Sequence, residues 1–159
     1  MYQSKDMYYK PYPTFLVDLE PIGSWFSQRF SKIDIQGEGY FIEVDIETLV
    51  PAQGWLIDDD EMETAWDRIT PSYVGLTTIV PLLICDGDVN FSCVVFVVEQ
   101  EVSDEFIDWC RVGFSMDYRQ NRVGGSVKWL DTPCKAKFQK TEYIDALDRF
   151  KKLCDTEWV

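Results

Sequence analysis

The chain has 159 residues, the length of one domain, and 46% of them are apolar, which excludes a disordered polypeptide. Its 28 acidic and 15 basic residues give a formal net charge of −13, which excludes unaided nucleic-acid binding because the phosphates would repel it. A basic partner would explain this charge, and plain solubility is the simpler alternative.

The negative charge is concentrated in the first two thirds of the chain. Residues 1–105 hold 5 basic and 20 acidic residues, a net charge of −15, whereas residues 106–159 hold 10 and 8, a net charge of +2. No apolar run approaches the roughly 20 residues that span a bilayer, and the first residues lack the apolar core of a signal peptide. We therefore expect a cytoplasmic protein with no membrane contact. It should form a single domain over residues 1–159, in which residues 1–13 are an N-terminal arm.

The first predicted elements are a short edge strand over residues 14–19 and a helix over residues 22–33. Pro21 suits the start of this helix, and Trp25 and Phe26 follow its apolar spacing. Gly37 and Gly39 then indicate a hairpin turn before a strand over residues 40–47.

Strict alternation in residues 40–47 places three carboxylates on the outward face of that strand: Glu43, Asp45 and Glu47. Like charges this close cost stability unless a cation or a basic partner compensates them. The competing interpretation is a solvated row that discourages edge-to-edge aggregation.

Residues 58–69 predict a second helix, in which Asp58 is the N-cap and Glu61 completes a capping box. The acidic run Asp58, Asp59, Asp60 and Glu61 has the oxygen ligands that Mg²⁺ or Ca²⁺ prefers. It lacks the spacing of an EF-hand loop, and the helix dipole favours negative charge here. We therefore expect no metal.

Residues 73–85 and 89–101 predict two strands joined by a hairpin at residues 86–88, with residues 94–98 in the middle of the sheet. Residues 106–118 predict a third strand; a helix starting after Ser103 is the alternative for its first half. Apart from Asp108, the side chains expected on one face of this strand are Phe106, Cys110, Val112, Phe114, Met116 and Tyr118. A short strand over residues 126–130 and a helix over residues 141–154, with Thr141 as N-cap, close the chain. The fold class is α+β: a mostly antiparallel sheet of five to six strands with two or three helices packed on one face.

The sequence contains no histidine, which removes the commonest general base and metal ligand and every Ser-His or Cys-His pair. No glycine-rich phosphate-binding loop stands between a strand and a helix. The five cysteines are odd in number and those at 85, 93 and 110 lie in apolar strand patterns, as expected of small hydrophobes in a reducing compartment. We therefore expect no enzyme, no catalytic residues and no cofactor.

The candidate partner-binding residues are the carboxylates expected to gather on one surface, since a complementary field accelerates association with a basic partner. They are Glu43, Asp45, Glu47, Asp58, Asp59, Asp60, Glu61, Glu99 and Glu101.

Residues 66–153 resemble in layout the immunity proteins of bacterial polymorphic and contact-dependent toxin systems. The resemblance consists of a Trp-containing helix (residues 61–69), an apolar hairpin (73–101), the segment 127–130 and the aromatic helix 143–150. It implies a cytosolic α+β protein that neutralises a basic, nuclease-like toxin by binding it. An acidic secretion chaperone or adaptor, a phage-type mimic of nucleic acid, and a carboxylate enzyme that uses a divalent metal are the alternatives.

Overall fold

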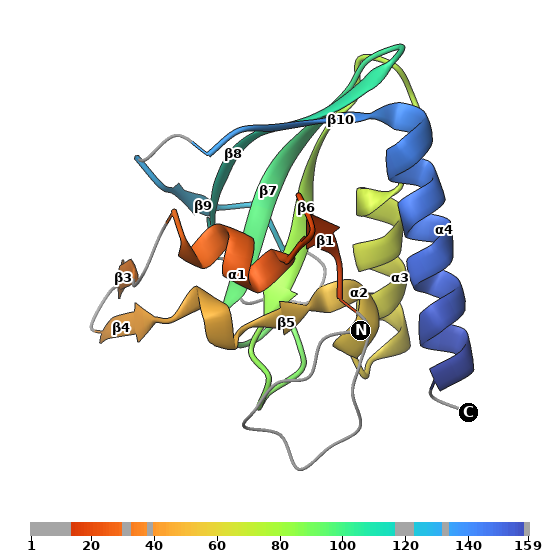
Figure 1. Cartoon of the computed structure of the whole chain (residues 1–159). Coiled ribbons are helices and arrows are strands. Elements are labelled where there is room, and N and C mark those ends of the chain that lie inside the picture. Colours follow the sequence, from red (N-terminus) through yellow and green to blue (C-terminus); the bar gives the residue numbers. More distant parts are fainter. Residues whose placement is uncertain (1–13, 30–32, 38–39, 117–122, 132–133, 158–159) are drawn as a thin grey trace.

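The computed structural model describes residues 14–29, 33–37, 40–116, 123–131 and 134–157, and it has an α+β fold (Figure 1). The predicted class is confirmed: within these residues a six-stranded antiparallel sheet packs against helices, and two separate two-stranded hairpins accompany it. The arm predicted over residues 1–13 lies outside the described residues.

The main sheet has the strand order β10-β8-β7-β6-β5, and β9 also pairs with β8. Strand β7 is central, as its continuous apolar run predicted, because both of its faces are covered. The strands are β5 (Val50–Pro51), β6 (Thr77–Ile84), β7 (Val95–Val102), β8 (Phe106–Ser115), β9 (Val127–Trp129) and β10 (Ala136–Gln139).

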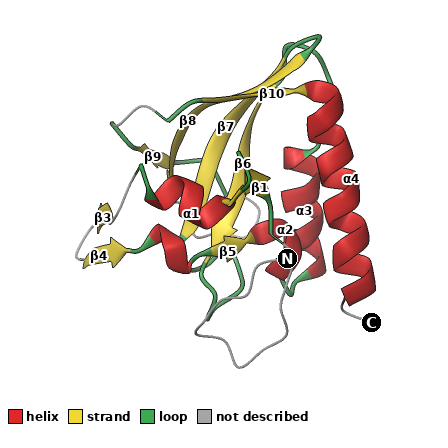
Figure 2. Ribbon diagram, viewed as in Figure 1, coloured by secondary structure: helices red, strands yellow, loops and turns green. Residues whose placement is uncertain are grey.

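In the described part of the chain, four α-helices and one 3-10 helix accompany the sheet (Figure 2). Helix α1 crosses the front of the sheet, and α3 and α4 stand side by side along its β6 edge (Figures 1 and 2). The bounds are α1 (Ile22–Ser27), η1 (Ile46–Thr48), α2 (Ala52–Trp55), α3 (Asp59–Ile69) and α4 (Lys140–Glu157). Among the described residues, no helix combines the length and the apolar content that crossing a bilayer requires.

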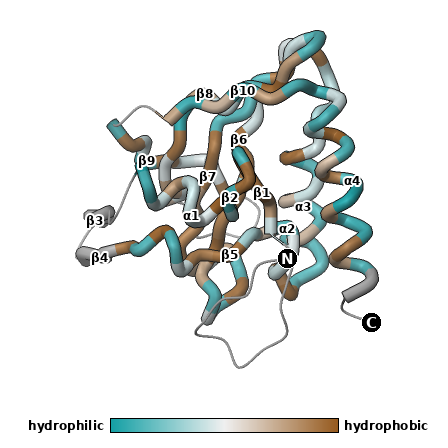
Figure 3. Tube along the Cα trace, viewed as in Figure 1, coloured by the Kyte–Doolittle hydropathy of each residue, from teal (hydrophilic) through white to brown (hydrophobic). Residues whose placement is uncertain are grey.

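The hydrophobic core lies between the strands and the helices, where apolar residues concentrate on β6, β7 and β8 (Figure 3). Phe26 of α1 meets Phe96 of β7 edge to face at 4.8 Å between ring centroids and stacks on Trp109 of β8 at 6.1 Å. Aromatic pairs of this kind add to the free energy gained by burial alone, so they fix α1 against the sheet.

A β-bulge in β8 changes which of its side chains face the core. Glu99 pairs with Arg111 and Gln100 with Trp109, so Cys110 is the extra residue. A one-residue insertion shifts every later side chain to the other face. Trp109 and Val112 consequently face the same core. The predicted shared face is wrong for Phe106 and Cys110, whereas Val112, Phe114 and Met116 do contribute to one core together, as predicted. Tyr118 lies outside the described residues. The alternative helix is also wrong, because β8 starts at Phe106.

The N-terminal third contains shorter elements than the sequence predicted. The edge strand is a small hairpin of β1 (Leu16–Val17) and β2 (Glu20–Pro21), and α1 ends at Ser27. The predicted glycine hairpin is present, because β3 (Ile33–Gly37) pairs antiparallel with β4 (Tyr40–Val44). At the C-terminus, α4 begins at Lys140, so Thr141 lies inside its first turn and is not the N-cap.

The connection between β6 and β7 is not the tight hairpin predicted at residues 86–88. Strand β6 ends at Ile84 and β7 starts at Val95, because Phe91 leaves the strand path and is buried in the core. A disulfide joins Cys85 to Cys93 across this loop, with their Cα atoms 6.4 Å apart. The expectation that these two cysteines act as small hydrophobes is therefore wrong, while Cys110 and Cys134 are not disulfide-bonded.

The disulfide should contribute to stability by constraining the unfolded chain. It joins residues eight apart, for which loop-closure entropy gives about 2.5 kcal/mol. We expect the double variant Cys85→Ser/Cys93→Ser to lose about 2 kcal/mol in urea unfolding under oxidising conditions. Dithiothreitol should destabilise the parent and the control Cys110→Ser, but not the double variant. Equal midpoints for parent and double variant would contradict the disulfide.

Candidate functional site

The predicted carboxylate row on residues 43–47 does not exist as a strand face. Strand β4 ends at Val44, and Asp45 caps the following turn η1, where its Oδ1 accepts a hydrogen bond from the Glu47 N–H at 3.1 Å. A short acidic side chain competes with the sheet by bonding its own backbone, which ends the strand early. Asp45 and Glu47 are exposed beside α1, and the side chain of Glu43 lies outside the described residues.

The acidic run at the start of α3 is divided between the surface and the core. Asp58 is the N-cap, as predicted, and its Oδ1 accepts from the Glu61 N–H at 3.0 Å. Glu61 does not complete the capping box: it is 4% exposed and its Oε2 accepts from the Phe91 N–H at 2.8 Å. Glu61 is therefore wrong as a partner-binding residue, because its carboxylate holds the β6–β7 loop.

Glu99 and Glu101 lie on β7, on the side of the sheet opposite the buried Val98. Glu99 forms an ion pair with Arg111 at 2.9 Å, and the Arg111 guanidinium covers the Trp129 ring at 3.9 Å. Glu99, Glu101 and Cys110 place ligand atoms within 4.8 Å of one another. Burial, followed by the charge of Glu101, raises the pKa of Cys110 to about 11, so its thiol is protonated at neutral pH and is a poor metal ligand. We assign no metal to this trio.

The predicted residues do not form one surface. Glu61 binds the β6–β7 loop, which leads into β7 at Val95. Glu101 lies six residues further along β7, a distance of about 20 Å. Asp45 and Glu47 belong to a third place beside α1 (Figure 1). The described members of this group therefore do not form the single acidic patch on which the binding hypothesis depends.

One acidic surface does form on the outer face of α3. Its members recur at helical spacing and are all exposed, and we call them the α3 ridge: Asp59, Asp60, Glu63 and Asp67. Within the described part of the chain, none of the four makes an ion pair. The α3 ridge retains the predicted Asp59 and Asp60 and adds Glu63 and Asp67, which were not among the predicted residues.

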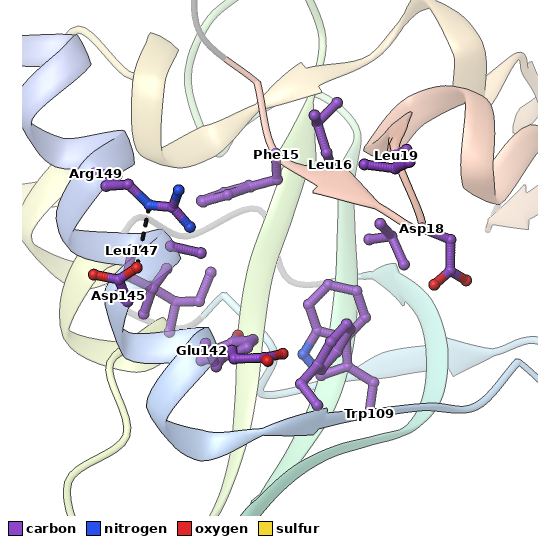
Figure 4. A pocket seen from close by; sticks show the side chains of 14 residues that line it. Phe15, Leu16, Asp18, Leu19, Trp109, Glu142, Asp145, Leu147 and Arg149 are labelled. Atoms are coloured by element: carbon purple, nitrogen blue, oxygen red, sulfur yellow. Dashed lines mark ion pairs between the residues drawn. The ribbon is translucent and has the colours of Figure 1, made fainter.

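A second feature is a cleft of about 520 Å³ between the β1–β2 hairpin and α4 (Figure 4). Its floor is apolar and aromatic, with Trp109 of β8, Phe138 of β10 and Tyr143 of α4 packed edge to face or tilted against one another. Phe15 closes one end, where its ring stacks on Phe150 at 4.1 Å. A cavity of this size, lined mainly by apolar groups, is typical of a binding site.

The floor of the cleft is held by the buried amide of Gln100, which is 1% exposed on β7. Its Oε1 accepts from the Tyr143 hydroxyl at 2.6 Å and from the Trp109 indole N–H at 3.3 Å, while its Nε2 donates to the Ile69 carbonyl at 3.0 Å. Burial raises the pKa of Tyr143, so the hydroxyl stays a neutral donor. One side chain thus joins the end of α3, strands β7 and β8, and helix α4.

The rim of the cleft is acidic. Asp18 comes from the hairpin, and Glu142 and Asp145 come from the first turns of α4 (Figure 4). Among the described residues, Arg149 is the one cation on the rim, and it pairs with Asp145 at 3.3 Å. Two rim carboxylates, Asp18 and Glu142, therefore have no ion-pair partner among the described residues.

The hairpin turn at the cleft is strained. Asp18 and Leu19 have φ values of 50° and 67°, a left-handed region that costs energy for a bulky side chain. Hairpin turns with two such residues usually contain Asn and Gly. The turn places Leu19, 90% exposed, and Leu16, 57% exposed, beside the cleft mouth. The sequence signal for this turn is weak, because Asp18 is a common turn residue but Leu19 is not.

Comparisons with protein-family models, with curated proteins and with solved structures find no match for this chain. No residue role is therefore transferred from a relative. The geometry of the α3 ridge and of the cleft is what bears on function.

Two variants of Glu61 separate its hydrogen bond from its charge. Burial raises the pKa of Glu61 above 4.5, against the opposing effect of the Phe91 N–H, so the folded state binds this proton more tightly than the unfolded state. Its contribution to stability therefore falls as pH rises above about 4.5. We expect Glu61→Gln, which keeps an acceptor without a charge, to be at least as stable as the parent at pH 7 and to lose this pH dependence.

Glu61→Leu is the matched variant, because it leaves the Phe91 N–H buried without an acceptor. We expect it to lose about 1–3 kcal/mol at any pH. Urea unfolding at pH 4.5 and pH 7 measures both. If Gln destabilised the protein as much as Leu does, the carboxylate would not be acting through this hydrogen bond.

Proposed function

We propose that this chain is a non-catalytic binding protein that neutralises a basic partner, in the manner of an immunity protein inhibiting a nuclease-like toxin. The observation that carries the proposal is the α3 ridge: four exposed carboxylates on one helix face, unpaired within the described residues. A basic surface laid along α3 would satisfy all four at once.

The α3 ridge has a cost in the free protein. Asp59 and Glu63, and Glu63 and Asp67, stand four residues apart, where like charges destabilise a helix by about 0.2–0.5 kcal/mol per pair. Of the four residues of the α3 ridge, only Asp59 and Asp60 lie in the first turn of the helix, where the helix dipole favours negative charge. Asp67 stands in the last turns, where the dipole disfavours it. The helix dipole therefore accounts for Asp59 and Asp60. A basic partner would account for Glu63 and Asp67.

The chain offers little for catalysis. Its sequence lacks histidine, and burial raises the pKa of both Cys110 and Cys134 to about 11, which keeps these thiols unreactive at neutral pH. Glu61 and Asp58 are committed to hydrogen bonds that hold the fold. These features support a binding role over the carboxylate-metal enzyme.

A cytoplasmic location belongs to the proposal, since an antidote must meet its toxin where the toxin acts. The Cys85–Cys93 disulfide weighs against this location, because disulfides are rare in the reducing cytosol. The binding role itself depends on the α3 ridge and holds in either compartment.

The proposal predicts a basic partner whose affinity depends on salt and on the α3 ridge. The full chain serves as bait, and the captured protein is then purified and titrated by calorimetry at 50 and 300 mM NaCl. We expect Kd to rise at least about tenfold with salt, because screening weakens contacts between exposed charges. Asp59→Lys/Glu63→Lys should weaken binding by a further factor of about ten.

Asp104→Lys/Glu105→Lys is the control for net charge, since both residues are exposed at the β7–β8 turn and the charge change is identical. It should retain most of the affinity. A partner of negative charge, an affinity insensitive to salt, or equal loss in both double variants would contradict the proposal. Displacement of the partner by duplex DNA would favour the nucleic-acid mimic, and an obligate dimer in solution would favour the chaperone.

A further inference from the structure

We propose that the cleft between the β1–β2 hairpin and α4 is a docking site for a cationic segment of the partner, which inserts one large apolar side chain between flanking lysines or arginines. This inference rests on the proposed function, because it names the part of a basic partner that the cleft would take. It adds a second contact surface, separate from the α3 ridge.

The floor of the cleft fits an apolar anchor. About 520 Å³ is enclosed by Val17, Ile69, Trp109 and Leu147, each of which is less than 10% exposed. Binding free energy at protein interfaces concentrates where a large side chain fills such a pocket. The Gln100 hydrogen bonds fix the floor before binding, so little ordering is required when the anchor enters.

The rim selects positive charge on either side of the anchor. Asp18 lies across the cleft from Glu142 and Asp145, and Arg149 is already paired with Asp145 (Figure 4). Three carboxylates against one guanidinium leave the rim with a net charge of −2. An apolar ligand without cations would leave Asp18 and Glu142 unpaired, so the charge complementarity favours a cationic segment.

The mouth of the cleft offers further apolar contact. Leu16 and Leu19 project beside it, and the strained turn at Asp18 and Leu19 is what exposes them. Strain of this kind persists where the surrounding structure enforces it and is found at binding sites. A segment lying along the hairpin would cover both leucines while its cations meet Asp18.

A second copy of this chain is a poorer occupant. Each copy has a net charge of −13, so two copies repel one another, and the acidic rim adds to that repulsion. The carboxylates that repel a second copy attract a basic protein.

The test uses a capped peptide, Gly-Lys-Lys-Phe-Lys-Lys-Gly, titrated into the full-length ¹⁵N-labelled chain and followed by NMR. We expect saturable shifts of the Trp109 indole N–H and of amides in residues 16–20 and 142–149. Replacing Phe by Ser in the peptide should raise Kd about tenfold, the effect of losing one buried aromatic side chain. Replacing the lysines by glutamates should abolish binding.

Variants of the chain locate the contact. Ala146→Trp, which fills the cleft from an exposed position on α4, should abolish binding, whereas Ile144→Trp, outside the cleft on the same helix, should not. Asp18→Asn and Glu142→Gln should each raise Kd about threefold, as expected for exposed ion pairs, and Asp148→Asn should leave it unchanged. None of these residues is in the core, so the variants should fold.

Shifts confined to the α3 ridge, equal binding of the Phe and Ser peptides, or unchanged binding by Ala146→Trp would overturn the inference. Concentration-dependent dimerisation that Ala146→Trp abolishes would assign the cleft to a second copy and overturn it too. If the Ala146→Trp chain still captured the basic partner at full affinity, the proposed function would stand and the cleft assignment would fail. If no basic partner bound the parent chain, the proposed function itself would fail.

Discussion

The buried amide of Gln100 is the interaction on which the arrangement of the site depends. It accepts hydrogen bonds from Tyr143 and Trp109 and donates one to the end of α3, so it ties two helices to the two central strands. A buried polar group of this kind is stabilising only when its partners are in place. The loss of one partner therefore destabilises the whole arrangement of the floor. Without the Gln100 amide, α4 would lose the hydrogen bond from Tyr143 to β7, and the position of α4 against the floor of the cleft would no longer be fixed by a polar contact.

Some acidic residues hold the fold, and others make no ion pair within the described part of the chain. Asp45 and Asp58 cap turns, Glu61 holds the β6–β7 loop, and Glu99 is neutralised by Arg111. The α3 ridge and the rim carboxylates Asp18 and Glu142 have no such role within the described residues. This difference matters because a negative net charge alone does not show whether the charge serves solubility or the recognition of a basic partner. The part of the negative charge that the fold leaves unpaired is the part that a basic protein would meet.

The sequence predicted the elements that depend on local periodicity and missed the features that depend on tertiary contacts. The central position of β7, the α3 N-cap at Asp58 and the β3–β4 hairpin followed from apolar runs, capping chemistry and glycines. The bulge at Cys110 was not predictable, because alternation assumes an unbroken ladder. Phe91 left the strand path to fill the core, and Glu61 turned inward to bond it, which no local rule anticipates. The cleft brings together residues 18, 109 and 142, so it exists only in the folded chain.

A double-mutant cycle between Gln100 and Tyr143 tests the central claim, that one buried amide organises the floor of the cleft. Urea unfolding of Gln100→Leu, Tyr143→Phe and the double variant gives the coupling energy between the two side chains. The structure predicts about 1 kcal/mol or more, because Gln100→Leu leaves the Tyr143 hydroxyl buried without its acceptor, and the double variant removes that hydroxyl. The Trp109 indole N–H loses its acceptor in Gln100→Leu and in the double variant alike, so it does not enter the coupling energy. If the two changes add to within about 0.3 kcal/mol, Gln100 and Tyr143 act independently and the floor is held by apolar packing instead.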